Sequence, residues 1–239
     1  MNNKVIFQNL GRIRYKEAWD LQEKLFQSVI DAKLSQAEPK QQYVLFCEHE
    51  PVYTLGKSGN KQNLLIAEHV CKSKNIDYFP IDRGGDITFH GPGQLVAYPI
   101  IDMEEFRVGV KAYIHKLEDV VIQTLQSYGI VAEKDDKAMG VWIDAQHPAK
   151  ARKICAIGVR TSRFVTMHGL ALNVNTNLEY FNYINPCGFT DRAVTSLQKE
   201  LGHEVDFDEV STRMKDAFTD VFGMDWVMEP AALQENIEY

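Results

Sequence analysis

The chain has 239 residues, of which 45% are hydrophobic, so it can bury one sizeable core, and we expect a single domain over residues 1–239. Its formal net charge of −7 at pH 7 disfavours nucleic acid as a partner, without excluding a local basic patch. The first residues show no signal-peptide pattern, and no apolar run approaches the roughly 18 residues of a membrane span. We therefore expect a cytoplasmic protein that does not enter a membrane.

The apolar residues near the start of the chain predict an amphipathic helix over residues 16–34. They recur three or four positions apart, at Ala18, Leu21, Leu25, Val29 and Ile30. Residues 42–56 follow as two strands around a turn at Pro51. Residues 76–83 predict another strand, which Pro80 places near a sheet edge or a bulge.

The second half of the chain alternates strands and helices. Residues 94–101 predict a strand, and residues 110–125 a long helix that Gly129 closes in the left-handed conformation. Residues 178–183 predict a short helix and residues 206–222 a final one. Four further segments are β-like, at 139–144, 152–160, 164–169 and 170–175. The pattern indicates an α/β protein of the α+β type, with a mixed, largely antiparallel β-sheet flanked by helices.

Residues 83–94, RGGDITFHGPGQ, concentrate glycines in one short segment. A glycine-rich loop often holds a phosphate through its backbone N–H groups. This segment has neither the spacing of a P-loop nor that of a dinucleotide-binding turn. Another group that must approach the backbone closely is therefore expected here.

The four cysteines form no C-x-x-C pair and are expected to be free thiols. Zinc binding by Cys47, His49 and His69 is a weak alternative, because their spacing matches no common ligand pattern. Cys187 lies between a proline and a glycine in a predicted loop, which makes it the candidate reactive thiol. The other cysteines, Cys47, Cys71 and Cys155, lie in apolar or helical stretches, where a cysteine usually acts as a small hydrophobe.

Lys153 lies in a predicted strand whose alternate residues Cys155, Ile157 and Val159 would share its face. A lysine on an otherwise apolar face has two interpretations. Its stem can follow the core while the ammonium reaches water. Alternatively, it is held in a partly desolvated site, where it can accept a proton or favour a neighbouring thiolate.

Five ordered motifs over about residues 40–202 resemble the lipoyl(octanoyl) transferase family. They are RGGDITFHGPGQLVAYPI, RKICAIGVR, HGLALNVN, INPCGF and VTSLQKELG. The resemblance implies the fold of biotin and lipoate ligases and one octanoyltransferase catalytic domain. It also implies that octanoyl passes from octanoyl-acyl carrier protein to a lysine of lipoyl domains, as the first step of endogenous protein lipoylation. The acceptors would be the lipoyl domains of 2-oxoacid dehydrogenases and the glycine cleavage H protein, with no ATP, metal or other cofactor.

The resemblance also implies the site residues. Cys187 would carry the acyl group as a thioester, and Lys153 would tune its thiol. Backbone and side chains from three segments would line a slot for the eight-carbon chain. These substrate-binding candidates are Arg83, Gly84, Gly85, Asp86, Ile87, Thr88, Phe89, His90, Ala156, Ile157, Gly158, Gly169, Leu170 and Ala171. Asp86 departs from the glutamine that is common at its position in the family, which affects no assigned role.

His90 and His168 each precede a glycine and are expected to border this site without transferring protons. Basic residues near Lys153 could form a patch for acidic carrier proteins, or they could simply be solvated charges on a strand edge. The residues of this expected patch are Lys150, Arg152, Arg160 and Arg163.

Three rival interpretations remain open. An ATP-dependent lipoate or biotin ligase would share the fold and need a lysine but no loop cysteine. A non-catalytic acyl-binding protein would keep the pocket and turn nothing over. In the third, Cys155 is the nucleophile in place of Cys187, although two strand residues two apart are separated by about 6.5–7 Å, too far for a direct hydrogen bond between them.

Overall fold

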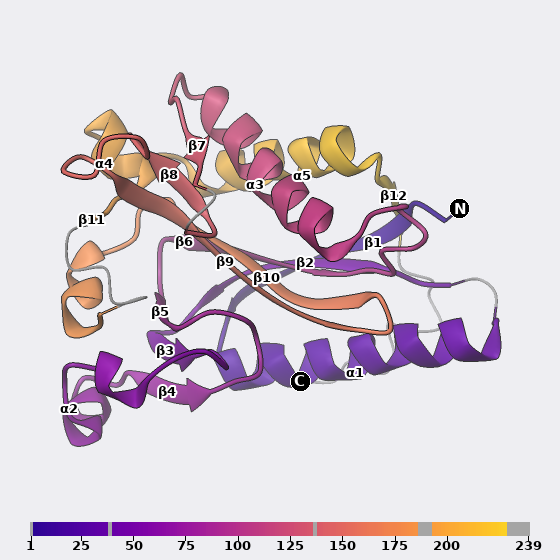
Figure 1. Cartoon of the computed structure of the whole chain (residues 1–239), viewed down its shortest axis with the longest axis horizontal. Coiled ribbons are helices and arrows are strands. Elements are labelled where there is room, and N and C mark those ends of the chain that lie inside the picture. The colour runs from indigo at the N-terminus through magenta and orange to yellow at the C-terminus, as the bar shows by residue number, and fades with distance from the viewer. Residues whose placement is uncertain (1, 38–39, 136–137, 186–192, 229–239) are drawn as a thin grey trace.

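The computed structural model describes residues 2–37, 40–135, 138–185 and 193–228 (Figure 1). Within these residues, nine strands form one large sheet, with parallel pairing of β1 to β2 and β12 and of β11 to β9, and antiparallel pairing elsewhere. The strand order is β12 (Asp225–Val227), β1 (Lys4–Ile13), β2 (Tyr43–His49), β6 (Gln94–Ile100), β10 (Val165–Asn173), β9 (Arg152–Ser162), β8 (Val141–Ile143) and β7 (Glu133–Lys134), with β11 (Ala193–Val194) beside β9. This mixed, largely antiparallel sheet confirms the predicted fold class.

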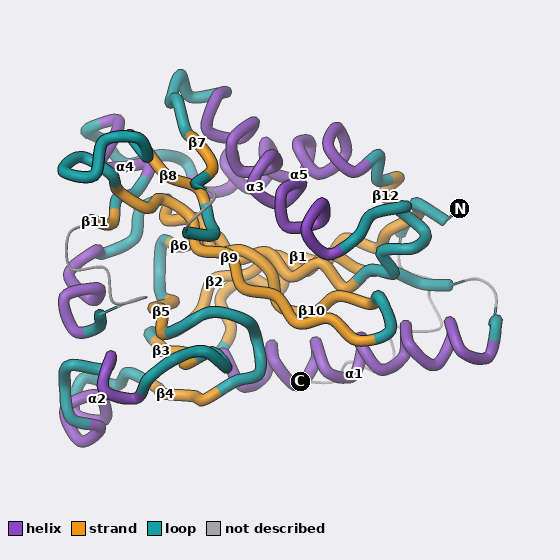
Figure 2. The backbone as a smooth tube through the Cα atoms, in the orientation of Figure 1, coloured by secondary structure: helices purple, strands orange, loops and turns teal. Residues whose placement is uncertain are grey.

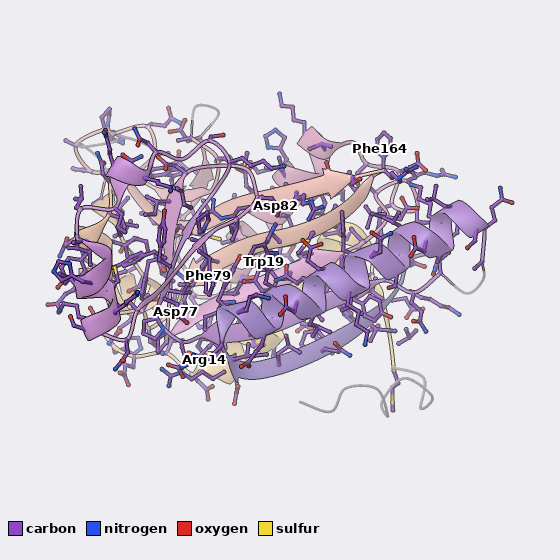
Figure 3. All side chains as sticks on the ribbon, turned by 90° about the horizontal axis from the view of Figure 1, so that it is seen from below. Arg14, Trp19, Asp77, Phe79, Asp82 and Phe164 are labelled. Carbon is purple, nitrogen blue, oxygen red and sulfur yellow. The ribbon has the colours of Figure 1, made fainter. Side chains whose placement is uncertain are left out.

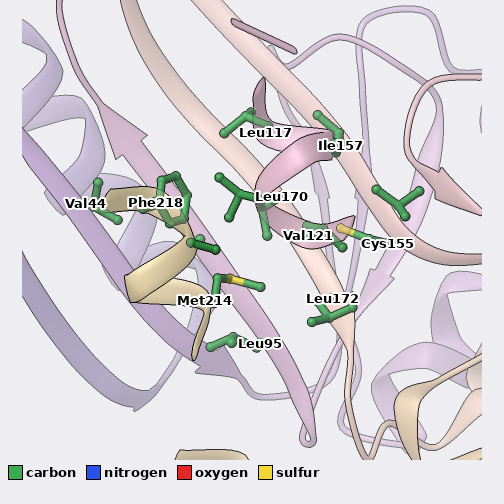
Figure 4. Close-up of a cluster of buried hydrophobic side chains, with 14 of the residues drawn as sticks. Val44, Leu95, Leu117, Val121, Cys155, Ile157, Leu170, Leu172, Met214 and Phe218 are labelled. Atoms are coloured by element: carbon green, nitrogen blue, oxygen red, sulfur yellow. The ribbon is translucent and has the colours of Figure 1, made fainter. Parts of the chain in front are cut away.

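Helices cover both faces of the large sheet (Figures 1 and 2). Helix α1 (Tyr15–Ser35) packs on one face, and α3 (Val110–Gln126) and α5 (Phe207–Phe222) pack together on the other. The core between the sheet and these last two helices includes Phe46, Leu170 and Phe218 (Figure 4). Shorter helices are α2 (Glu68–Ser73), α4 (Leu197–Leu201) and the 3₁₀ turns η1 (Lys61–Asn63) and η2 (Leu178–Tyr183). None of the helices in the described part of the chain is both long and apolar enough to cross a bilayer.

A second, three-stranded sheet lies beside the start of α1 (Figure 1). It has the order β4 (Asp77–Pro80), β3 (Val52–Leu55) and β5 (Ile87–His90), so β4 is an edge strand, as Pro80 predicted. Trp19 of α1 packs against Phe79 of β4, with ring centroids 6.5 Å apart (Figure 3). The two strands predicted on either side of Pro51 both exist, but β2 joins the large sheet and β3 the small one.

The long helices agree with their predicted ranges. Helix α5 is the clearest case: Asp206 accepts hydrogen bonds from two N–H groups of its first turn, and Gly223 ends it with φ +71°. Gly129 also takes a left-handed conformation, with φ +74°, just after α3. The segments predicted at 164–169 and 170–175 form the single strand β10. The sequence interpretation missed β1, because half-exposed polar residues interrupt its apolar alternation.

Candidate active site

A cavity of about 400 Å³ lies between the large sheet, the glycine-rich segment 83–90 and the start of α1. Strands β6, β9 and β10 supply one wall, and Tyr15 lies at the end formed by α1. Most of the substrate-binding candidates line this one cavity although they come from three separate segments. They are Arg83, Gly85, Asp86, Ile87, Thr88, His90, Ala156, Ile157, Gly158, Gly169, Leu170 and Ala171.

Two candidates from the glycine-rich segment do not line the cavity. The N–H of Gly84 donates a hydrogen bond to the carbonyl of Val159, 2.9 Å away, and so ties the segment to β9. The ring of Phe89 stacks on Tyr180 with centroids 4.6 Å apart, inside the small apolar cluster around β3. Both residues therefore support the wall from behind.

Lys153 also lines the cavity, but not on the face that alternation predicted. In the β8–β9 ladder, Val141 pairs with Cys155 while Trp142 pairs with Lys153, so Ile154 is an extra residue on β9. This bulge reverses the alternation locally. The prediction that Lys153 and Cys155 share a face is therefore wrong: the lysine faces the cavity and the cysteine faces the core.

The Lys153 side chain is held by its neighbours on β8 and the preceding turn. Its Nζ donates a hydrogen bond to the carbonyl of Met139 at 3.0 Å and lies 4.6 Å from the ring centroid of Trp142. The indole Nε1 of Trp142 in turn donates to the carbonyl of Ala138 at 2.7 Å. The amine is thus placed on an aromatic face at the cavity wall, where a cation is favoured.

Cys155, the alternative nucleophile, is fully buried beside Val121 and Leu172 (Figure 4). Burial raises the pKa of its thiol to about 12, because an anion there would lose its hydration. It does not line the cavity. This environment suits a structural thiol and gives no support to Cys155 as the nucleophile.

Cys187 lies outside the described residues. The described chain on either side of it reaches the cavity, which Phe181 lines before it and Ala193 and Val194 line after it. Strand β11 pairs with β9 directly beside Lys153, because the N–H of Thr195 donates to the Lys153 carbonyl at 2.9 Å. Cys187 thus belongs in sequence to a segment whose two ends are both anchored at the site.

His90 lies in a continuous chain of hydrogen bonds along the cavity. Its Nδ1 lies 2.8 Å from Oε1 of Gln94, which can only accept, so we assign the proton to Nδ1. The amide of Gln94 donates to Oδ1 of Asn173 at 2.9 Å, and Asn173 donates to the Thr195 carbonyl at 3.0 Å. Burial lowers the pKa of His90 to about 3, so its ring is neutral and serves to orient its neighbours.

His168 lies at the cavity in a strained backbone conformation, with φ +60° within strand β10. Its N–H donates to Oε1 of Gln22 on α1 at 3.1 Å, and its Nε2 lies 2.9 Å from Oδ1 of Asp82. Burial lowers the pKa of His168, so the ring is neutral and donates its Nε2 proton to that carboxylate. Both histidines border the cavity, as the sequence predicted.

The glycines of the site make room for Arg83 and the loop backbone. Nη2 of this buried guanidinium donates to the carbonyl and the hydroxyl of Thr54, at 2.8 and 3.0 Å. A Cβ on Gly158 would lie 2.9 Å from Arg83 Cδ and 2.9 Å from the Gly84 carbonyl. The expected close approach to the backbone is therefore made in part by the protein's own arginine.

The expected basic patch does not form a single free surface. Arg152 pairs with Glu200 and Asp144 at 2.6 and 2.5 Å, and Arg160 pairs with Asp82 and Glu23 at 2.6 and 2.7 Å. These two arginines are also eight residues apart on one strand, which corresponds to roughly 25 Å. The charges of these two arginines are largely neutralised within the molecule, which gives the expected patch no support.

The described residues do not support the zinc alternative that the sequence left open. Both ring nitrogens of His49 have partners, the Ile13 carbonyl at 3.0 Å and the Tyr98 hydroxyl at 2.7 Å. In the part of the chain that the structure describes, no three His, Cys, Asp or Glu side chains are grouped to hold a metal ion. Cys47, Cys71 and Cys155 are buried, and none of them forms a disulfide within the described residues.

Sequence reasoning missed several cavity residues. Tyr15, Tyr98, Trp142 and Asn173 all line it, yet none belongs to a segment assigned to substrate. Trp142 had no usable signal, because its contact with Lys153 depends on cross-strand register. Tyr98 and Asn173 lie within motifs of the family resemblance, RGGDITFHGPGQLVAYPI and HGLALNVN. That they face the cavity depends on how their strands pair in the sheet, which the motifs do not show.

Comparison with known proteins gives a consistent family. Residues 14–219 match the model of the lipoyl protein ligase A/B catalytic domain. An octanoyltransferase of Bacteroides fragilis is 53% identical over 211 residues, which cover 88% of this chain and 95% of that protein. One of Porphyromonas gingivalis is 51% identical over 217 residues, 91% of this chain; the chain spans only 44% of that longer relative.

Solved structures of low sequence identity share the fold. Lipoate-protein ligase A bound with ATP matches with a TM-score of 0.67 at 14% identity, covering 96% of this chain and 89% of that one. The biotin protein ligase of Aquifex aeolicus in complex with biotin and ATP matches with a TM-score of 0.53 at 15% identity, covering 92% and 70%. Together with the family match and the close relatives, these similarities show that the chain belongs to the lipoyl(octanoyl) transferase family and is an acyltransferase enzyme.

Proposed function

We propose that the protein transfers an octanoyl group from octanoyl-acyl carrier protein to the lysine amine of lipoyl domains through a thioester on Cys187. The relatives named octanoyltransferase support the octanoyl transfer. The observation that carries the two-residue site is the position of Lys153, whose amine lies at the cavity wall beside β11. Cys187 precedes the first residue of that strand, Ala193, by six positions.

The first step exchanges one thioester for another. The thiolate of Cys187 attacks the donor carbonyl carbon, a new C–S bond forms, and the bond to the phosphopantetheine sulfur breaks. The departing sulfur takes up the proton that the Lys153 ammonium gives up, which leaves that amine neutral for the second step. The free-energy change is small because the bond types are the same. A nearby ammonium on Lys153 would favour the thiolate, which is the reactive form.

The second step forms an amide and is downhill. The amine of the acceptor lysine attacks the Cys187 thioester, a C–N bond forms, and the C–S bond to Cys187 breaks. The neutral amine of Lys153 would collect the proton that the attacking nitrogen loses. Because the acyl group arrives already activated, neither step requires ATP or a metal ion.

The cavity suits an alkyl chain with a reactive carbonyl at one end. Val96, Ala156 and Ala171 give it apolar wall surface, and each buried methylene contributes about 0.8 kcal/mol to binding. Backbone N–H groups of the glycine-rich segment could stabilise the oxyanion of the tetrahedral intermediate. The acceptors would be the lipoyl domains of 2-oxoacid dehydrogenases and the glycine cleavage H protein, in the cytoplasm, with no nucleic acid or membrane involved.

A transfer assay tests the proposal. Purified protein is mixed with octanoyl-acyl carrier protein and a lipoyl domain without ATP, and the mass of the lipoyl domain is followed. We expect octanoylation of the domain by the wild type and a large loss in Lys153→Ala. Pyrophosphate exchange that depends on free octanoate and ATP would instead identify a ligase. A protein that binds the donor and turns over neither substrate would be an acyl-binding protein.

A further inference from the structure

Glu118 is a buried carboxylate on the face of α3 that packs against the sheet. Its side chain is 3% exposed. Oε2 lies 2.9 Å from Nδ1 of His115, and Oε1 accepts a hydrogen bond from the N–H of Gly140 at 3.3 Å. Burying a carboxylate costs free energy unless hydrogen-bond partners compensate for the lost hydration. His115 and Gly140 supply such partners, which indicates that the fold keeps Glu118 in this position.

Gly140 belongs to the turn that surrounds the Lys153 side chain. The carbonyl of the preceding residue, Met139, accepts the hydrogen bond from Lys153 Nζ at 3.0 Å. Gly140 has φ +121°, and a Cβ there would lie 2.5 Å from the Cys155 carbonyl and 3.4 Å from Lys153 Cε. The turn is therefore in close contact with the lysine stem, and a small shift of the turn would move the amine.

The peptide unit between Met139 and Gly140 connects the two contacts. Its N–H donates a hydrogen bond to Glu118, and its carbonyl accepts one from Lys153. The carboxylate and the amine therefore bind opposite ends of one rigid planar group. The orientation of this peptide fixes the direction in which its carbonyl points. We propose that Glu118 is a positioning residue for Lys153, acting through this peptide from the other side of β9.

This inference rests on the proposed function, in which Lys153 acts on the thiol of Cys187. Glu118 is not among the described residues that line the cavity. Removing the side-chain oxygen that accepts from Gly140 N–H should therefore lower kcat of octanoyl transfer while leaving KM for the donor nearly unchanged. A merely structural role would lower stability without moving the Lys153 amine in the folded protein.

Four variants separate these roles. Glu118→Gln keeps an oxygen that can accept from Gly140 N–H, whereas Glu118→Met fills similar space without an acceptor, and Glu118→Ala leaves a cavity. Glu105→Ala is the matched control, since Glu105 is a part-buried carboxylate that pairs with Lys40 at 2.9 Å, away from the cavity. If Glu118→Ala fails to fold, Glu118→Met decides the question.

The primary readout is the NMR resonance of Lys153 after reductive ¹³C-methylation, assigned with Lys153→Arg. We expect it to move in Glu118→Met and Glu118→Ala, and to stay near its wild-type position in Glu118→Gln and Glu105→Ala. Transfer kcat should fall about tenfold or more in the first two and recover to within about threefold in Glu118→Gln. An unmoved Lys153 resonance in Glu118→Met would overturn the inference, whatever the activity. Absence of transfer by the wild type would contradict the proposed function alone, and the resonance would still decide the role of Glu118.

Discussion

Lys153 and Trp142 face each other across the β8–β9 pair, with the lysine Nζ 4.6 Å from the indole centroid. This contact exists because Ile154 is bulged from β9. Without the extra residue, regular alternation would turn the lysine toward the core, onto the face of Cys155. The bulge thus separates the two side chains on one strand, with the amine at the cavity and the buried thiol in the core.

Replacing Trp142 should lower kcat through the lost contact with the Lys153 amine, in addition to any loss of stability from the buried ring. In Trp142→Leu the aromatic face is lost, and a cation–π contact of about 1–2 kcal/mol corresponds to a loss of about five- to thirtyfold in kcat. Trp142→Phe keeps a ring and loses the hydrogen bond to the Ala138 carbonyl, so stability should fall by about 1 kcal/mol with kcat within about threefold. Transfer kinetics and urea unfolding measure both. Wild-type kcat in Trp142→Leu would show that the ring does not support the amine.

The two cysteines of the competing mechanisms should respond in opposite ways. Cys155→Ala removes a buried thiol whose pKa is raised to about 12, so we expect transfer within about twofold of wild type and a loss of about 1 kcal/mol in unfolding free energy. Cys187→Ala should abolish transfer. Inactive Cys155→Ala together with active Cys187→Ala would reverse the assignment of the nucleophile.

Two buried histidines should make the protein less stable in mild acid. Burial lowers the pKa of His90 to about 3 and that of His49 to about 4. Each has a pKa of about 6.5 in the unfolded chain, which therefore binds more protons than the folded state below that pH. Above about pH 6.5, these two histidines should make no pH-dependent contribution to the free energy of unfolding. Below it, the free energy should fall by up to about 1.4 kcal/mol per pH unit for each histidine.

His90→Asn tests that assignment, because asparagine can still donate toward Gln94 and does not titrate. Urea unfolding at pH 5, 6 and 7 should show a pH slope reduced by about one proton relative to wild type. An unchanged slope would mean that His90 does not titrate differently in the two states.

Gly158→Ala should disturb the wall formed by Arg83. The new Cβ would lie 2.9 Å from Arg83 Cδ and from the Gly84 carbonyl, so we expect a loss of about 1–3 kcal/mol in stability and a raised KM for the octanoyl donor. Gly109→Ala is the control, since a Cβ at Gly109 meets nothing within 4 Å. That variant should cost less than about 1 kcal/mol and leave KM unchanged. Equal KM values in the two variants would contradict this account of the glycines.

The sequence predicted the elements whose signal is local. Helix α5 has both its periodic apolar stripe and its two cap residues within its own sequence, and Pro80 correctly marked β4 as an edge strand. Strand β1 was missed because it depends on partners far away, β2 and β12, and its register shifts between Asn9 and Arg12. Its own residues carry little alternation.

Many residues of the site could be predicted from the sequence, but the directions of their side chains could not. The family resemblance indicated Lys153 and many of the residues that line the cavity, but no periodicity could reveal the bulge at Ile154. The positive φ of His168 and its contact with Asp82 depend on the neighbouring strand and loop, so no local pattern in the sequence could predict them. Likewise, the pairing of Arg160 with Glu23 and Asp82, which neutralises one residue of the expected basic patch, is a tertiary effect.

The central claim is that Cys187 carries the acyl group. The most direct test is intact-protein mass spectrometry after mixing the protein with octanoyl-acyl carrier protein, without ATP and without an acceptor, followed by peptide mapping. The account predicts one octanoyl group per chain, located on Cys187, absent in Cys187→Ser and released when a lipoyl domain is added. An octanoyl group mapped to Cys155, or transfer that proceeds at the wild-type rate in Cys187→Ser, would contradict it.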